Sequence, residues 1–205
     1  MLTVGLTGGI ACGKSETAKL LSLNGAKIID LDQVSREVVQ PGTEAWLKIT
    51  SFFGQEVLCG DGSLNRKRLG EIIFADPKKR KKLNEITHET IIKQVQIQKD
   101  KFKADPSNRG KVLVIMAPLL IEAGMNNMVD RVIVVYCTEE IQKSRLMKRE
   151  NIDEQEAVRR IRSQMPLEEK MQFANYIIDN SGSLEETKKQ VAEIWNSLIM
   201  VAPNI

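Results

Sequence analysis

The chain has 205 residues, of which 42% are hydrophobic and 28% are charged. These values suit one globular domain and exclude a disordered, collagen-like or coiled-coil chain. Its longest apolar run, residues 112–121, is interrupted by Pro118, and a membrane span needs about 20 residues. The three cysteines lack ligand spacing and there is a single histidine, which disfavours a zinc site. We expect a cytoplasmic protein without a signal peptide, because no basic start precedes an apolar stretch.

The net charge of +3 is unevenly distributed along the chain. Residues 76–111 contain eleven basic and five acidic residues, and residues 78–82 are all basic. Such a run is typical of a solvated helix face. A nucleic-acid surface is disfavoured because no aromatic side chains are interleaved to stack bases. A surface that attracts a small polyanionic substrate is the third interpretation, and charge alone does not decide among them.

Strands and helices alternate along most of the chain. Short apolar, β-branched runs predict five strands, at 2–7, 26–29, 111–116, 129–136 and 176–178. Helical spacing is found at 14–24, 139–150, 153–164 and 184–200. Between 33 and 103 no strand is predicted, and helical patterns are broken at 41–42, 59–62 and 76–77. This order predicts an α/β fold with a parallel sheet covered on both sides and a helical insertion after the second strand.

The first predicted strand is followed by the pattern Gly, four residues, Gly-Lys-Ser. Its residues are Gly8, Gly9, Ile10, Ala11, Cys12, Gly13, Lys14 and Ser15. Between a strand and a helix, this spacing lets consecutive backbone N–H groups surround a β-phosphate at the positive end of the helix. Lys14 would reach the β- and γ-phosphates, and the Ser15 hydroxyl would ligate Mg²⁺. The sequence therefore predicts a nucleoside triphosphate site.

Two carboxylates follow the second predicted strand, at Asp30 and Asp32. The strand at 111–116 ends without a carboxylate, and no Asn-Lys-x-Asp base-reading motif of GTPases is present. Because parallel strands end at one crevice, both aspartates are expected near the γ-phosphate, pointing in opposite directions if the segment is extended. Asp32 would accept the proton of an attacking hydroxyl. It also fits as the N-cap of a helix that begins near residue 33.

Several further segments carry a resemblance to one family. They are Gly5–Ile10 with the phosphate loop, Asp30-Leu31-Asp32 with Arg36–Gly42, Leu64–Arg66 to Phe74, Asp76–Arg80, His88, Pro118-Leu119-Leu120-Ile121-Glu122, Gln142, Arg145, Arg149, Gln164, Ala174, Asp179 and Asn180. On these residues the chain resembles dephospho-CoA kinases along essentially its whole length. The segment that runs from Asp30-Leu31-Asp32 to Pro41-Gly42 and the segment Pro118–Glu122 together make the resemblance specific.

The resemblance implies that the ATP γ-phosphate is transferred, with Mg²⁺, to the 3′-hydroxyl of dephospho-CoA. It implies a P-loop NTPase fold like that of nucleoside monophosphate kinases, with three layers and a five-stranded parallel sheet. The core would comprise 1–32, 111–138 and 171–205, with a helical substrate-binding insertion at 33–110 and a small lid at 139–170. We expect a monomer or weak homo-oligomer with no nucleic-acid or membrane partner.

The resemblance also implies roles for individual residues. Asp32 would be the base, and Arg145 and Arg149, one helical turn apart in the lid, would stabilise charge on the transferring phosphoryl group. A solvated helix face is the alternative for both arginines. The ATP-binding stretch would extend through Glu16 and Thr17, and the substrate contacts would be Arg66, Arg80, His88 and Glu122. A structural role for His88 and a helix-start carboxylate for Glu122 remain open.

The chain departs from the family pattern around its phosphate loop. Glu16 stands where a threonine usually donates to the α-phosphate, so its carboxylate should repel ATP. Cys12 in the loop suggests sensitivity to thiol reagents that ATP would prevent. His88-Glu89 and Ala174-Asn175 replace the usual His-Pro and Ala-Asp.

Three other functions are compatible with parts of the sequence. Another small-molecule or nucleoside kinase is the first, because a fold does not determine its acceptor. The second is a regulator that binds a nucleotide without catalysis, and the third is nucleic-acid binding by residues 78–82.

Overall fold

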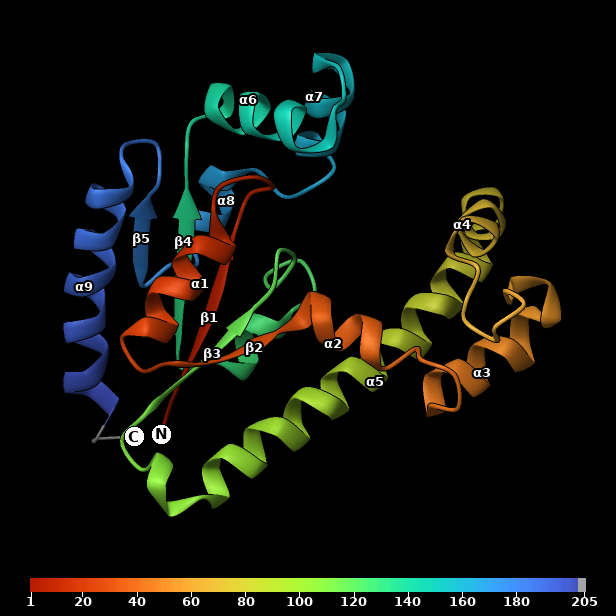
Figure 1. Cartoon of the computed structure of the whole chain (residues 1–205), viewed down its shortest axis with the longest axis horizontal. Helices are drawn as coiled ribbons and strands as arrows, with labels where there is room; N and C mark the ends of the chain where they lie inside the picture. The colour runs from red at the N-terminus through yellow and green to blue at the C-terminus, as the bar shows by residue number, and fades with distance from the viewer. Residues whose placement is uncertain (203–205) are drawn as a thin grey trace. The chain divides into compact units, whose positions relative to one another are not determined.

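The structure is a computed structural model that describes residues 1–202 of the chain (Figure 1). It contains two compact units, one formed by Met1–Ile29 together with Asp105–Ile205 and the other by Asp30–Ala104. Within residues 1–202, every helix is too short or too polar to pass through a bilayer. The phosphate-loop segment belongs to the first unit, and Asp32 belongs to the second.

A five-stranded parallel sheet forms the centre of the first unit. Its strands are β1 (Leu2–Gly8), β2 (Lys27–Asp30), β3 (Val112–Met116), β4 (Arg131–Tyr136) and β5 (Tyr176–Asp179). The order across the sheet is β2-β3-β1-β4-β5, with β1 parallel to β3 and β4, and β4 parallel to β5. Every residue of β1 and β3 is buried, as expected for strands covered on both faces. The predicted α/β class and its parallel sheet are confirmed.

The first unit also contains helices, some of which contact the sheet and some of which contact one another. They are α1 (Lys14–Leu23), α6 (Glu139–Glu150), α7 (Glu154–Arg162), α8 (Leu167–Met171) and α9 (Leu184–Val201), with short 3-10 turns at Pro106–Asn108 and Met125–Met128. Helices α1 and α9 contact each other, α1 covers β1 and β3, and α9 contacts β5 (Figure 1). The four helices predicted from spacing are confirmed. The five-residue α8 was not predicted as a separate helix, because it is too short to show a helical period.

The second unit is helical. It contains α2 (Leu31–Glu37), α3 (Glu44–Phe53), a 3-10 turn (Gln55–Val57), α4 (Arg66–Ala75) and α5 (Pro77–Ala104). Its core consists of Ala45, Ile49, Phe53, Val57, Leu69 and Ile86. An isolated antiparallel bridge joins Leu58 to Leu64. The prediction that this region forms helices is confirmed.

Helix α5 begins at the predicted break. Asp76 accepts hydrogen bonds from the backbone N–H groups of Lys78 and Lys79 at 2.8 and 3.2 Å, and Pro77 occupies the first helical position. The basic run at 78–82 follows immediately, and all five of its residues are exposed. Positively charged side chains are unfavourable at the N-terminus of a helix, because that end of the helix dipole is itself positive. The Asp76 carboxylate offsets part of this cost.

Candidate active site

The phosphate loop joins the central strand β1 to helix α1. Strand β1 ends at Gly8 and α1 begins at Lys14. Between them, Ala11 and Gly13 have φ values of 59° and 96°, both in the left-handed region. Glycine takes this conformation freely, whereas alanine takes it at a cost of about 1 kcal/mol. The strained residue therefore lies in the loop itself, where other contacts must hold it in place.

Three side-chain amides hold the loop from distant parts of the chain. Gln142 Nε2 donates to the Ile10 carbonyl at 2.9 Å, and the Ile10 N–H donates to Gln164 Oε1 at 3.0 Å. Asn180 Nδ2 donates to the Cys12 carbonyl at 2.8 Å, and its Oδ1 accepts from the Thr187 hydroxyl at 2.8 Å. Gln142, Asn180 and Thr187 are buried, so these bonds are protected from water. The loop is thus held on both sides of Ala11.

These amides also explain two of the loop glycines. A Cβ atom on Gly9 would lie 2.4 Å from Gln142 Nε2, and one on Gly13 would lie 2.0 Å from Asn180 Nδ2. Both distances are well below a van der Waals contact. A side chain at either position would displace the amide that supports the loop, so glycine preserves these two contacts.

Gln142, Gln164 and Asn180 were absent from the site residues predicted from the sequence. Each belongs to a segment that carried the family resemblance, so that resemblance was the signal that could have identified them. Periodicity could not, because their hydrogen bonds to the loop span at least 132 residues of chain.

Helix α1 differs from most helices of the chain at its first turn. Its N-cap residue is Gly13, and among residues 1–202 no side-chain cap bond is made there. By contrast, α2, α3, α4, α6, α7 and α9 are each capped by an Asp, Asn, Thr or Ser oxygen. Uncapped N–H groups and the positive end of the helix dipole attract anions. This end of α1 is therefore suited to a phosphate group.

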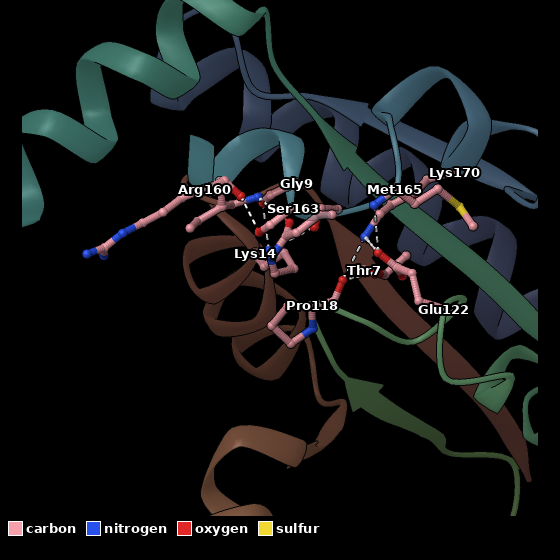
Figure 2. Close-up of polar contacts among 12 residues, drawn as sticks. Thr7, Gly9, Lys14, Pro118, Glu122, Arg160, Ser163, Met165 and Lys170 are labelled. Carbon is pink, nitrogen blue, oxygen red and sulfur yellow. Dashed lines mark hydrogen bonds and ion pairs between the residues drawn. The ribbon is translucent and has the colours of Figure 1, made fainter. Parts of the chain in front are cut away.

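The side chains that follow Gly13 differ in accessibility. Lys14 Nζ donates to the carbonyls of Gly8 and Gly9 at 3.0 and 2.7 Å, so its charge lies over the loop (Figure 2). Ser15 is exposed and Glu16 is half-buried. Thr17 is fully buried, and its hydroxyl has no hydrogen-bond partner among residues 1–202.

Two buried thiols are in contact, one in the loop and one just after β4. The Cys137 Sγ atom, just after β4, donates to Cys12 Sγ at 3.2 Å. This hydrogen bond and the charge of Lys14 lower the pKa of the Cys12 thiol from its ordinary value. The same bond, together with burial, raises the pKa of Cys137. Cys12 is therefore the thiolate of the pair when one ionises.

A cavity of about 260 Å³ lies beside the loop supports. Gln142 and Gln164 line it together with Tyr136, Cys137, Arg162 and Leu167. The two glutamines thus connect the wall of this cavity to the Ile10 peptide.

The two predicted lid arginines have different environments on α6. Arg145 is half-buried and donates to the Asn180 carbonyl at 3.0 Å, and its buried Nη1 has no partner among residues 1–202. Arg149 is exposed and pairs with the neighbouring Glu150 at 3.0 Å. The structure therefore brings Arg145 to the residue that supports Cys12, and Arg149 to the helix surface.

Glu122 lies in the turn after β3. Its Oε1 atom accepts from Lys170 Nζ at 2.8 Å and from the Met165 N–H at 3.2 Å. Glu122 is not at the start of an α-helix, so the helix-start alternative is wrong. Its carboxylate instead joins two segments that are distant in sequence.

The capping expectation for Asp32 is also wrong. Helix α2 begins at Leu31, and Asp30 is the N-cap, whose Oδ1 accepts from the Asp32 N–H at 2.9 Å. The segment turns into the helix one residue after β2, so the two aspartates do not alternate along an extended strand. Asp32 lies in the first turn of α2, where a carboxylate is favoured by the helix dipole.

The remaining predicted substrate contacts belong, like Asp32, to the second unit. Arg66 is the first residue of α4, and Arg80 and His88 lie on α5. All three side chains are exposed. His88 is therefore not a buried structural histidine.

A parallel sheet whose central strand runs into a phosphate loop and an uncapped helix defines the phosphate-loop class of nucleotide-binding proteins. Known proteins narrow the class. The sequence profile of the family described as Dephospho-CoA kinase matches residues 2–186. The chain therefore belongs to the dephospho-CoA kinase family, and it is an ATP-dependent phosphotransferase.

Individual proteins are similar to this chain over nearly its full length. A dephospho-CoA kinase of Syntrophotalea carbinolica is 45% identical over 199 residues, which cover 97% of this chain and 93% of the relative. One from Geobacter metallireducens is 43% identical, covering 99% and 100%. The solved structure of dephospho-CoA kinase from Campylobacter jejuni is 28% identical, with a TM-score of 0.73 and 97% of each chain covered. A solved Thermus thermophilus protein gives a TM-score of 0.81 at 27% identity, covering 96% and 97%.

Proposed function

We propose that this kinase transfers the γ-phosphoryl group of ATP to the ribose 3′-hydroxyl of dephospho-CoA, giving CoA and ADP in the cytoplasm. The observation that supports ATP binding most directly is the uncapped start of α1, next to a loop held open by Gln142, Gln164 and Asn180. The membership of the dephospho-CoA kinase family supports the acceptor. We also propose a monomer or weak homo-oligomer that has no nucleic-acid partner.

The stretch Gly8–Thr17 would bind the triphosphate. Lys14 would exchange its bonds to the Gly8 and Gly9 carbonyls for bonds to phosphate oxygens, which are stronger because both partners are charged. The exposed Ser15 hydroxyl is a hard oxygen ligand of the kind that Mg²⁺ prefers, and it would hold that ion together with phosphate oxygens. When bound, the ion supplies neutralisation of the phosphate charge.

Arg145 is the better placed of the two arginines for an anionic ligand. Its buried Nη1 lacks an acceptor among residues 1–202, and burying an unpaired donor is costly. A phosphate oxygen would satisfy it. Arg149 would have to leave Glu150 to reach the ligand, and we assign that movement to the lid at 139–170.

Asp32 would accept the proton of the 3′-hydroxyl, because its carboxylate is not used as the helix cap. Arg66, Arg80, His88 and Glu122 would contact the acceptor. The positive charges of Arg66 and Arg80 suit its diphosphate, and the other residues of the exposed basic run at 78–82 would add to the attraction. Insertion 33–110 would thus be the acceptor-binding part, with the core at 1–32, 111–138 and 171–205.

The test is ADP release with ATP and Mg²⁺, in the presence and absence of dephospho-CoA, for the wild type and Asp32→Asn. We expect strong stimulation by dephospho-CoA, reduced at least about 100-fold in Asp32→Asn with ATP binding retained. Asp30→Asn is the matched control, because it removes the same charge two residues away while asparagine still caps the helix. It should keep most of the stimulation.

Other outcomes separate the alternatives. If stimulation by dephospho-CoA survives in Asp32→Asn, the proposed kinase activity would stand but Asp32 would be rejected as the base. A folded wild type that binds ATP but is not stimulated would reject dephospho-CoA. Other hydroxyl acceptors would then be screened.

A further inference from the structure

A lysine is completely buried between the end of the proposed lid and the turn after β3. Lys170, on α8, has 0% of its side chain exposed. Its Nζ atom lies 2.8 Å from Glu122 Oε1 and donates to the Pro118 carbonyl at 2.8 Å (Figure 2). A buried charge is costly unless it is paired and hydrogen-bonded, and Lys170 meets both conditions. Hydrophobic side chains of similar volume often stabilise such sites equally well, so stability alone does not explain a lysine here.

From Lys170, one chain of contacts leads to the phosphate loop through Glu122. The carboxylate oxygen that pairs with Lys170 also accepts from the Met165 N–H at 3.2 Å. The residue before Met165 is Gln164, whose Oε1 accepts from the Ile10 N–H at 3.0 Å. Lys170 thus holds Glu122 in place, Glu122 holds the 164–165 peptide, and Gln164 holds the loop.

A second chain reaches the same loop through Pro118. The carbonyl that accepts from Lys170 Nζ also accepts from the Thr7 hydroxyl at 3.2 Å. Thr7 is fully buried in β1 and immediately precedes Gly8. Both chains therefore begin at one ammonium group, and they end at Ile10 and at Thr7, on opposite sides of Gly9 in the sequence.

We infer that Lys170 is a positioning residue for ATP: it fixes the phosphate loop through Glu122–Met165–Gln164 and through Pro118–Thr7. The inference rests on the proposed ATP site at Gly8–Thr17. The Lys170 ammonium group contacts Glu122 and Pro118, which lie outside the loop, so it would act through them. Its contribution is geometric, because loop amides must point at the phosphates before binding for the bonds to form without further ordering.

The experiment measures the ATP Kd by calorimetry, without acceptor, at a temperature at which every variant is folded. In Lys170→Met, Glu122 loses its buried partner and is free to turn toward water, releasing Met165. We expect the ATP Kd to rise about tenfold, the effect of losing a charge-assisted hydrogen bond. Leu198→Ala is the control, because it removes a fully buried side chain from α9 outside both chains of contacts. It should lower the Tm comparably and leave the ATP Kd within about twofold.

A double-mutant cycle tests the route. Gln164→Ala should raise the ATP Kd by itself, and the variant that combines it with Lys170→Met should resemble the weaker-binding single variant, because both changes interrupt one chain. Glu122→Gln is the milder variant if Lys170→Met does not fold. It keeps an oxygen for Met165 and for Lys170 but loses the charge, so a rise of about threefold is expected.

An unchanged ATP Kd in folded Lys170→Met or Glu122→Gln would overturn the inference, and so would an equal rise in Leu198→Ala. Fully independent effects of Lys170→Met and Gln164→Ala would reject the Glu122 route. Weaker ATP binding in the Lys170, Glu122 and Gln164 variants, together with a wild type that binds ATP but shows no turnover with dephospho-CoA, would support the inference while contradicting the proposed function.

Discussion

Asn180 donates its side-chain amide to the Cys12 carbonyl at 2.8 Å across 168 residues of chain. The same side chain accepts from Thr187, and the Asn180 backbone carbonyl accepts from Arg145. One residue after β5 thus joins the phosphate loop, α6 and α9. A local change at Asn180 should therefore be measurable at the ATP site.

We expect Asn180→Ala to weaken ATP binding about tenfold and to lower the stability by about 1–2 kcal/mol, because a buried hydrogen bond to the loop is lost. Asn175→Ala is the matched control. The side chain of Asn175 also binds a distant backbone group, because its Oδ1 atom accepts from the Val132 N–H at 2.8 Å. That N–H group lies near the start of β4 and not in the phosphate loop. Calorimetric ATP binding and thermal unfolding should show similar destabilisation in both variants, with weaker binding confined to Asn180→Ala. Equal ATP affinities would contradict the supporting role.

Gly13→Ala should abolish ATP binding. Its new Cβ would lie 2.0 Å from Asn180 Nδ2, and the residue has a φ of 96°, so the change strains the backbone and displaces the supporting amide together. Gly124→Ala is the control for backbone strain without a steric clash, because Gly124 has a φ of 68° and open space around its Cβ position. It should cost about 1 kcal/mol of stability and leave the ATP Kd unchanged. Retained nucleotide affinity in folded Gly13→Ala would show that the contact with Asn180 is dispensable.

Glu16→Thr should lower the KM for ATP about threefold, since it removes a half-buried negative charge from the first turn of α1 and restores a hydroxyl donor. The charge component is screened by salt, so the difference between variant and wild type should shrink from 20 mM to about 500 mM salt. Steady-state kinetics at both salt concentrations measures this. An unchanged or higher KM at low salt would refute the repulsion argument.

Thiol labelling should occur in two phases. Cys59 is exposed and should react first, whereas Cys12 and Cys137 are buried and should react only when the loop opens. The hydrogen bond from Cys137 and the charge of Lys14 lower the pKa of Cys12, whereas the pKa of Cys137 is raised, so Cys12 should be the first of the two buried thiols to react. ATP should suppress the labelling of Cys12 in the slow phase, and in Cys12→Ala only Cys137 should remain to be labelled slowly. Mass spectrometry of a Cys59→Ser protein isolates that phase, and labelling of Cys12 that ATP does not slow would contradict the prediction.

Much of the architecture follows from local sequence patterns. Short β-branched runs identified all five strands, and the spacing from Gly8 to Ser15 between a strand and a helix identified the phosphate loop. These features are local, because backbone geometry and side-chain period act over a few residues. The family resemblance added the reaction and the proposed residues of the lid and of the acceptor site.

Tertiary structure decided which polar groups serve the loop and which serve the helices. Asp30 rather than Asp32 caps α2, because the chain turns into the helix two residues earlier than its pattern indicated. Gln142, Gln164 and Asn180 converge on the loop, and Lys170 is buried between Glu122 and Pro118. In sequence, each is an ordinary polar residue on or near a helix. Its role depends on burial and on partners more than 40 residues away, which only the folded chain brings within hydrogen-bond distance.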